Sequence, residues 1–151
     1  MGIVDLLLAI LHHLLVFSLA AILAAEALLL TGEVAGSRLG RLAVVDRFYG
    51  LNAGLVIVVG IARVVFGLKG WEFYVYNWSF WAKMAAFAGV ALLSIVPTRR
   101  ILSWSRKAAG TPDFSAPAAE LASVRRFIRA QMIVFTLIPI FAAMMARGYG
   151  Y

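Results

Sequence analysis

The sequence predicts an all-α integral membrane bundle of four transmembrane helices, in a single domain that covers residues 1–151. Of these residues, 64% are hydrophobic and only 14% are charged, and the mean hydropathy is +0.94. Water-soluble domains do not have such a composition. A helix needs about 20 predominantly apolar residues to cross the hydrocarbon core of a bilayer. Four stretches are long enough, and the helices are expected at about residues 4–31, 43–67, 76–97 and 118–146.

The first apolar stretch begins almost at Met1 and is expected to be a retained helix, not a secretory signal. It has no basic residue before the apolar run, and it extends to Leu30, whereas the apolar part of a signal peptide has about 7 to 15 residues. Thr31 and Gly32 are typical of a helix end. Because the chain has no cysteine, it can form neither a disulfide nor a thiolate metal site.

Turn and aromatic residues mark the next boundaries. Gly67 and Gly70 flank the loop after the second helix, and Pro97 is expected to end the third. Residues 118–129 are expected to form a short cytoplasmic helix that leads into the last span. An interfacial belt of aromatic residues is expected where the third helix begins, formed by Trp71, Tyr74, Tyr76, Trp78 and Trp81.

The basic residues predict the orientation in the membrane. Ten of the 14 Lys and Arg residues follow the first or the third helix, namely Arg38, Arg41, Arg47, Arg99, Arg100, Arg106, Lys107, Arg125, Arg126 and Arg129. Because basic loops stay on the cytoplasmic side, both termini are expected outside. We therefore expect a multi-pass protein of the bacterial cytoplasmic (inner) membrane. Topology and attraction to anionic lipid headgroups account for the net charge of +7, so nucleic acid is not expected as a partner.

Lys83 is the first candidate for a functional residue. It lies in an apolar run with no carboxylate nearby in the sequence, and a lone lysine at membrane depth is costly and therefore suggests a function. From the helical rise, His12 and His13 lie roughly 12 to 14 Å, and Lys83 roughly 10 to 12 Å, from the outer ends of their helices. At this shared depth, the three nitrogen side chains can form a ligand set for a metal or haem.

His12 and His13 cannot both face the same point, because neighbouring residues in a helix are about 100° apart. His13 shares a face with Phe17 and with several alanines, whose small side chains leave room for a flat cofactor. We therefore expect His13 to be the buried ligand, with His12 as the close alternative. In the structural alternative, the histidines hydrogen-bond neighbouring helices and Lys83 extends toward the headgroups.

Arg63 and Arg147 lie near the expected outer ends of the second and fourth helices. Their guanidinium groups can bind haem propionates or another anionic group that enters from outside. The alternative is that both arginines anchor helix ends at the membrane surface.

Glu26 is a carboxylate within the first span, near its inner end. An ion pair with a nearby basic residue such as Arg47 is the structural interpretation, since charges within membranes are usually paired. Asp46, Arg47 and Tyr49 form a polar face on the second helix that Glu26 can join. A proton relay through this face is the alternative.

Four sequence strings resemble a bacterial family of small four-helix membrane proteins, and they are Leu11–Leu14, Asp46–Gly50, Phe80–Met84 and Leu92–Thr98. More remotely, a histidine on the first helix with Trp81 and Lys83 at the start of the third is similar to the HemJ-type protoporphyrinogen oxidases, which bind b-type haem. That resemblance implies His13 or His12, together with Lys83, as haem-binding residues. The copper-resistance D family belongs to the same broad group and implies copper as an alternative.

The expected function is that of a b-type haem protein, which either oxidises a porphyrin or passes electrons to a quinone or a redox partner protein. Whether the protein is an enzyme stays open at this point. A copper-handling or transport protein is one alternative, because methionine thioethers bind cuprous ion, although Met84, Met132, Met144 and Met145 lie in apolar runs where ordinary packing explains them. A structural membrane subunit is the other. A homo-oligomer is compatible with each of them.

Overall fold

The computed structural model describes residues 2–149, and nearly all of them are helical. The elements are α1 (Gly2–Leu29), α2 (Gly36–Phe66), α3 (Gly70–Val75), α4 (Trp78–Gly110), α5 (Ala118–Phe135) and α6 (Leu137–Ala146). Four helices are long and apolar enough to cross a membrane: α1, α2, α4, and α5 with α6 as one span. The predicted all-α bundle with four transmembrane helices is confirmed.

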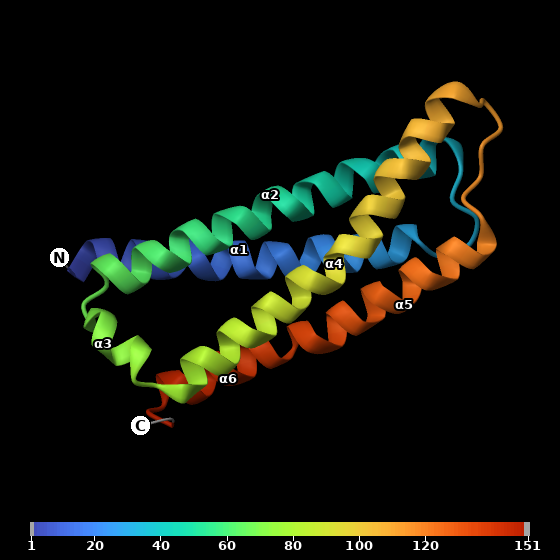
Figure 1. The fold of residues 1–151 in the computed structure, drawn as a ribbon. Coiled ribbons are helices and arrows are strands. Elements are labelled where there is room, and N and C mark those ends of the chain that lie inside the picture. Colours follow the sequence, from blue (N-terminus) through green and yellow to red (C-terminus); the bar gives the residue numbers. More distant parts are fainter. Residues whose placement is uncertain (1, 150–151) are drawn as a thin grey trace.

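The bundle consists of two helical hairpins (Figure 1). In one, α1 packs along α2, and in the other, α4 packs against α5 and α6. The hairpins meet through contacts of α2 with α4 and of α1 with α5, whereas α6, among the described residues, contacts only α4 and α5. They therefore diverge toward the end that carries α3 and both chain termini (Figure 1). We call this the terminal end, and the opposite one, with loops 30–35 and 111–117, the basic end.

Polar contacts tie the hairpins together at the basic end. The Ala116 amide donates to the Val34 carbonyl oxygen at 3.0 Å. Arg125 of α5 donates from Nε to the carbonyl of Leu30 at 2.6 Å and from Nη2 to that of Gly32 at 2.7 Å. The last carbonyls of a helix have no partner within it, so Arg125 satisfies groups at the end of α1 from the other hairpin.

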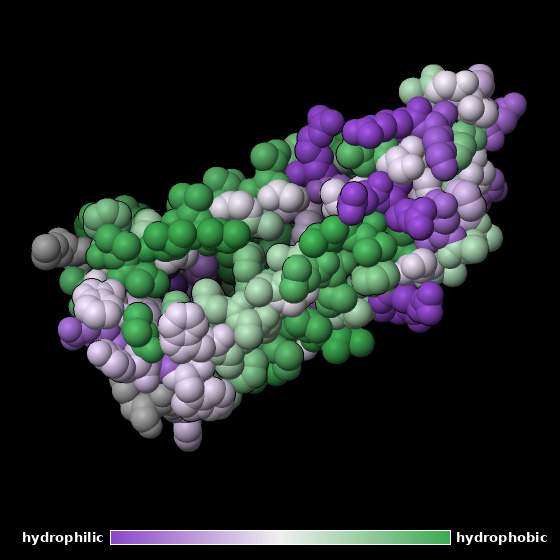
Figure 2. Space-filling model, in the orientation of Figure 1, coloured by the Kyte–Doolittle hydropathy of each residue, from purple (hydrophilic) through white to green (hydrophobic). Residues whose placement is uncertain are grey.

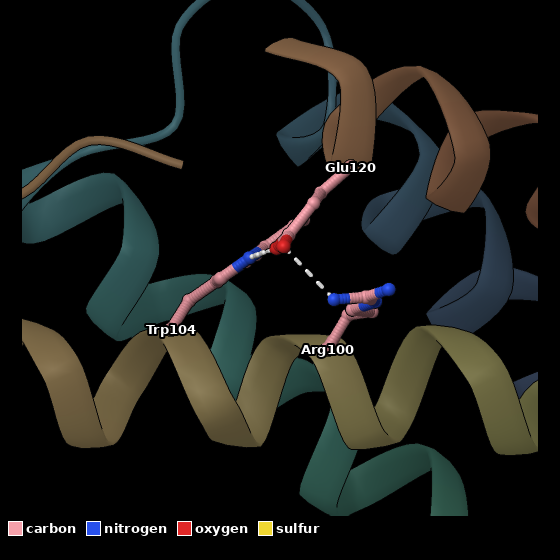
Figure 3. A network of polar contacts seen from close by, with 3 residues as sticks. All are labelled: Arg100, Trp104 and Glu120. Carbon is pink, nitrogen blue, oxygen red and sulfur yellow. Dashed lines mark hydrogen bonds and ion pairs between the residues drawn. The ribbon is translucent and has the colours of Figure 1, made fainter. Parts of the chain in front are cut away.

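Glu120 fixes the start of α5 to α4 (Figure 3). Its carboxylate accepts a hydrogen bond from Arg100 Nη1 at 2.9 Å and another from Trp104 Nε1 at 2.7 Å. The Trp104 side chain is fully buried, and a buried indole N–H needs such an acceptor. At the basic end, a core aromatic residue and an ion pair thus share one carboxylate.

The prediction that Pro97 ends the third helix is wrong, because α4 continues past it to Gly110. Proline removes one backbone hydrogen bond, but the rest of the helix packs against α5 with Ile101 and Trp104 in the core. Proline is tolerated in this way within membrane helices. The second span also begins earlier than expected, at Gly36, since its first turns lie beyond the apolar run.

The last span is interrupted at a place that the sequence analysis did not predict. The expected lead-in helix at residues 118–129 is continuous with the span as part of α5, and the break comes at Thr136. Pro139 follows three residues later and has no N–H to bond the carbonyl of Phe135. Phe135 and Ile138, on either side of the break, line the cavity described below.

Candidate functional site

A cavity of about 300 Å³ lies between the two hairpins in the terminal half of the bundle. Figure 2 shows it as a hollow between α2 and α4, with hydrophilic atoms at its bottom. Its walls are mostly apolar, and the side chains with polar groups that line it are His12, Arg63, Tyr74 and Lys83. These four residues come from α1, α2, α3 and α4, so the cavity exists only when both hairpins are assembled.

His12 is the histidine that faces the cavity, and it is half-buried there. Its ring packs on α2 at Gly60, where a Cβ atom would lie 3.4 Å from His12 Cε1. The Nδ1 atom is buried, and no hydrogen-bond partner for it lies among residues 2–149. A buried ring nitrogen without a partner is uncommon, and it is a free position for a ligand.

His13 is about 100° around the helix from His12 and does not line the cavity, so the prediction that His13 is the buried histidine is wrong. Its side chain is exposed, and its Nδ1 atom is 2.7 Å from the carbonyl oxygen of Ala9 in the same helix. The small-residue face that we expected to be buried carries Phe17, which is 70% exposed. The buried stripe of α1 contains Leu19, Leu23 and Glu26, and two turns before Leu19 that stripe reaches His12.

Lys83 enters the cavity from α4. It is half-buried, and its Nζ atom lies 5.5 Å from the centre of the Phe80 ring. No carboxylate within the described part of the chain forms an ion pair with Lys83. His12 interacts electrostatically with both Lys83 and Arg63. The structure therefore brings a histidine and Lys83 to the same cavity, as expected, and that histidine is His12.

Arg63 and Tyr74 lie toward the terminal end of the cavity. The Arg63 Nε atom is buried, again with no hydrogen-bond partner in the described range. Tyr74 is buried in α3, outside the spanning helices, and burial raises the pKa of its hydroxyl while the nearby charge of Arg63 lowers it. The tyrosine is therefore a neutral hydrogen-bond donor at neutral pH.

The lining of the cavity contains three basic side chains, and none of the lining residues that the structure describes is acidic. The Arg63 guanidinium is always charged, and a positive charge in a mostly apolar wall attracts an anionic group more strongly than it would in water. The cavity therefore suits a ligand with an apolar body and at least one anionic substituent.

Residues 4–150 match the family described as "Predicted membrane protein (DUF2214)". The chain belongs to this family. Membership agrees with the four apolar helices and indicates a protein embedded in a lipid bilayer. No curated protein and no solved structure matches the chain. The DUF2214 description names no ligand or activity, so the similarity to HemJ-type oxidases and to the copper-resistance D family stays a prediction.

The remaining predicted site residues of this DUF2214 member lie elsewhere. Arg147 is exposed at the end of α6 and does not line the cavity. Arg47 is exposed as well, whereas Glu26 is buried and interacts with Asp46 instead. The interpretation of Glu26 as the ion-pair partner of Arg47 is therefore wrong: neighbouring residues of α2 point in different directions, and it is Asp46 that faces α1.

The sequence analysis missed the cavity contributions of Gly60 and Tyr74. Gly60 does indicate close helix packing, since a glycine within a membrane helix often permits the approach of a neighbour, but it does not indicate a cavity. Tyr74 is one of the five residues predicted to form the interfacial aromatic belt, but its side chain is buried. The other four side chains are exposed, namely those of Trp71, Tyr76, Trp78 and Trp81. Nothing in the sequence alone distinguishes it from those four.

Proposed function

We propose that this protein binds b-type haem in the cavity between its hairpins, with His12 and Lys83 as the candidate iron ligands. One observation carries the proposal: two nitrogen side chains from opposite hairpins, one with a buried unpartnered ring nitrogen, line one apolar cavity. Neutral imidazole is a common ligand of haem iron. An amine ligates only in its neutral form, which burial away from water favours.

Arg63 and Tyr74 are the residues proposed to hold the haem propionates. Arginine binds carboxylates through a charge-assisted pair of hydrogen bonds, and Arg63 has a buried Nε atom with no other partner among the described residues. The neutral Tyr74 hydroxyl is a further donor on the same side. Arg147, which is exposed, is not part of this proposal.

Bound haem would supply one-electron chemistry, while the protein sets the ligands and excludes water. Oxidation of a porphyrin and electron transfer to a quinone or a redox partner protein are the two activities proposed for it. The predicted orientation directs the terminal end, and with it the propionate side, toward the outer face of the cytoplasmic membrane.

The optical spectrum of the purified protein tests haem binding. Protein from cells supplied with a haem precursor is expected to show an intense Soret band, with haem and protein in equal amounts. A protein that is folded and yet lacks this band under those conditions would reject the proposal. The ligand variants that go with this measurement are described in the Discussion.

Copper binding is a second candidate, because Met84 and Met145 line the same cavity as His12. Two thioethers and an imidazole are suitable ligands for cuprous ion. If this candidate is right, Met84→Leu weakens cuprous ion binding at least tenfold in a competition titration with a chromophoric chelator. The matched control is Met132→Leu, since Met132 does not line the cavity. Equal affinities of both variants and wild type would exclude this cavity as a copper site.

A further inference from the structure

A second polar cluster lies nearer the basic end, where all four spans meet. It consists of Glu26 of α1, Asp46 and Tyr49 of α2, Thr98 of α4 and Gln131 of α5. Glu26 is 1% and Gln131 0% exposed, and Asp46 and Tyr49 are also buried. None of the five lines the cavity at the terminal end.

Two buried oxygen atoms of this cluster have no hydrogen-bond partner among the described residues. Thr98 Oγ1 donates to Asp46 Oδ1 at 2.7 Å, and Gln131 Nε2 donates to Tyr49 Oη at 2.9 Å. The carboxyl groups of Glu26 and Asp46 are close enough to influence each other electrostatically. Within residues 2–149, Glu26 Oε1 and Gln131 Oε1 are buried and have no hydrogen-bond partner.

The basic side chains of this end do not neutralise the two carboxyl groups. Arg38 and Arg125 donate to main-chain carbonyls at the end of α1, and Arg47 and Arg99 are exposed. The ion pair that the described residues contain, between Arg100 and Glu120, lies outside the cluster. Two unneutralised carboxylates inside a membrane bundle are prohibitively costly, so at least one of the two negative charges must be neutralised by a cation.

We propose that Glu26, Asp46 and Gln131 form a binding site for one monovalent cation, either a proton or a sodium ion. The oxygen acceptors come from three different helices, and Gln131 contributes a neutral carbonyl that is independent of the acidic pair. A proton lets one carboxyl group donate to the other. A sodium ion takes the same place through oxygen coordination, as hard cations prefer.

A groove of about 320 Å³ between α2 and α4 lies beside the cluster, although Glu26, Asp46 and Gln131 do not line it. Tyr49, Thr98 and Arg99 are among the residues that line it, and the first two hydrogen-bond within the cluster. Leu19 and Phe87 line both this groove and the cavity at the terminal end. These two apolar side chains lie between the cation site and the proposed haem site.

Infrared spectroscopy of haem-free protein tests for the proton. In sodium-free buffer at neutral pH, the wild type is expected to show the C=O stretch of one protonated carboxyl group, which moves to lower frequency in D₂O. Glu26→Gln and Asp46→Asn should each shift or remove this band, because either change replaces one carboxyl group of the pair and alters the hydrogen bond of the other. The matched control is Glu120→Gln, which removes an ion-paired carboxylate and should leave the band unchanged.

Addition of sodium chloride, with choline chloride as the control for ionic strength, distinguishes the two cations. If the site takes sodium, the band disappears and the melting temperature rises in wild type but not in Glu26→Gln. A band insensitive to sodium identifies the proton. If wild type shows neither a protonated-carboxyl band nor a sodium-dependent melting temperature, the proposal is overturned. This test of the cation site needs only the wild-type protein, so it remains valid if a variant does not fold. Its outcome does not depend on haem binding.

Discussion

His12→Ala is expected to abolish the haem spectrum, whereas His13→Ala is expected to leave it intact. The two histidines are adjacent in sequence, yet His12 lines the cavity and His13 is exposed and bonded within its own helix. Removal of an axial ligand exposes the iron to another ligand or leaves the haem unbound. We expect the haem content of His12→Ala to fall at least tenfold, measured by the pyridine haemochrome assay on purified protein.

The adjacent-residue comparison controls for effects on insertion and stability. Both variants remove the same imidazole group from the same helix, so a general defect of α1 would affect both. Equal haem contents of the two variants would contradict the assignment of His12, and loss only in His13→Ala would restore the assignment that the small-residue pattern suggested.

Lys83→Met is expected to change the position of the Soret band and of the visible bands, or to abolish haem binding. The methionine has a similar length but no amine, so the ligand on the α4 side of the iron changes or is lost. Optical and electron paramagnetic resonance spectra of the oxidised protein would detect either outcome, because both depend on the axial ligand.

Lys69→Met is the matched control for the lysine. Lys69 is exposed in the loop before α3, with its Nζ atom 4.2 Å from the centre of the Phe73 ring, and it does not line the cavity. The control should have the spectrum of wild type. If the Lys83→Met spectrum is also unchanged, the lysine is not an iron ligand, although His12 can still be one.

Much of the fold could be predicted because it depends on composition along the chain. The four spans follow from apolar length, and the placement of Lys83 with a histidine follows from counting the helical rise from each end. Helix faces were harder to predict. The small neighbours of His13 and the charge of Arg47 favour these residues over His12 and Asp46, and both predictions are wrong. Small or charged neighbours are weak evidence for which side of a helix packs against another.

The breaks in the helices could not be predicted from residue type alone. Pro97 and Pro139 both lack the amide hydrogen, but α4 continues through the first, whereas the last span is interrupted just before the second. The difference depends on what each helix packs against. Tertiary contacts of this kind have no local signal in the sequence.

The divergence of the hairpins toward the terminal end has a consequence for the order of assembly. Since the hairpins are held together at the basic end and α6 contacts neither α1 nor α2 among residues 2–149, we expect the bundle to fold and insert before any ligand binds. A hydrophobic molecule dissolved in the bilayer can then enter sideways, between the helices, without crossing water. A bound ligand would hold the two hairpins together at the terminal end as well. The free energy of unfolding would then be higher for the ligand-bound protein than for the ligand-free protein.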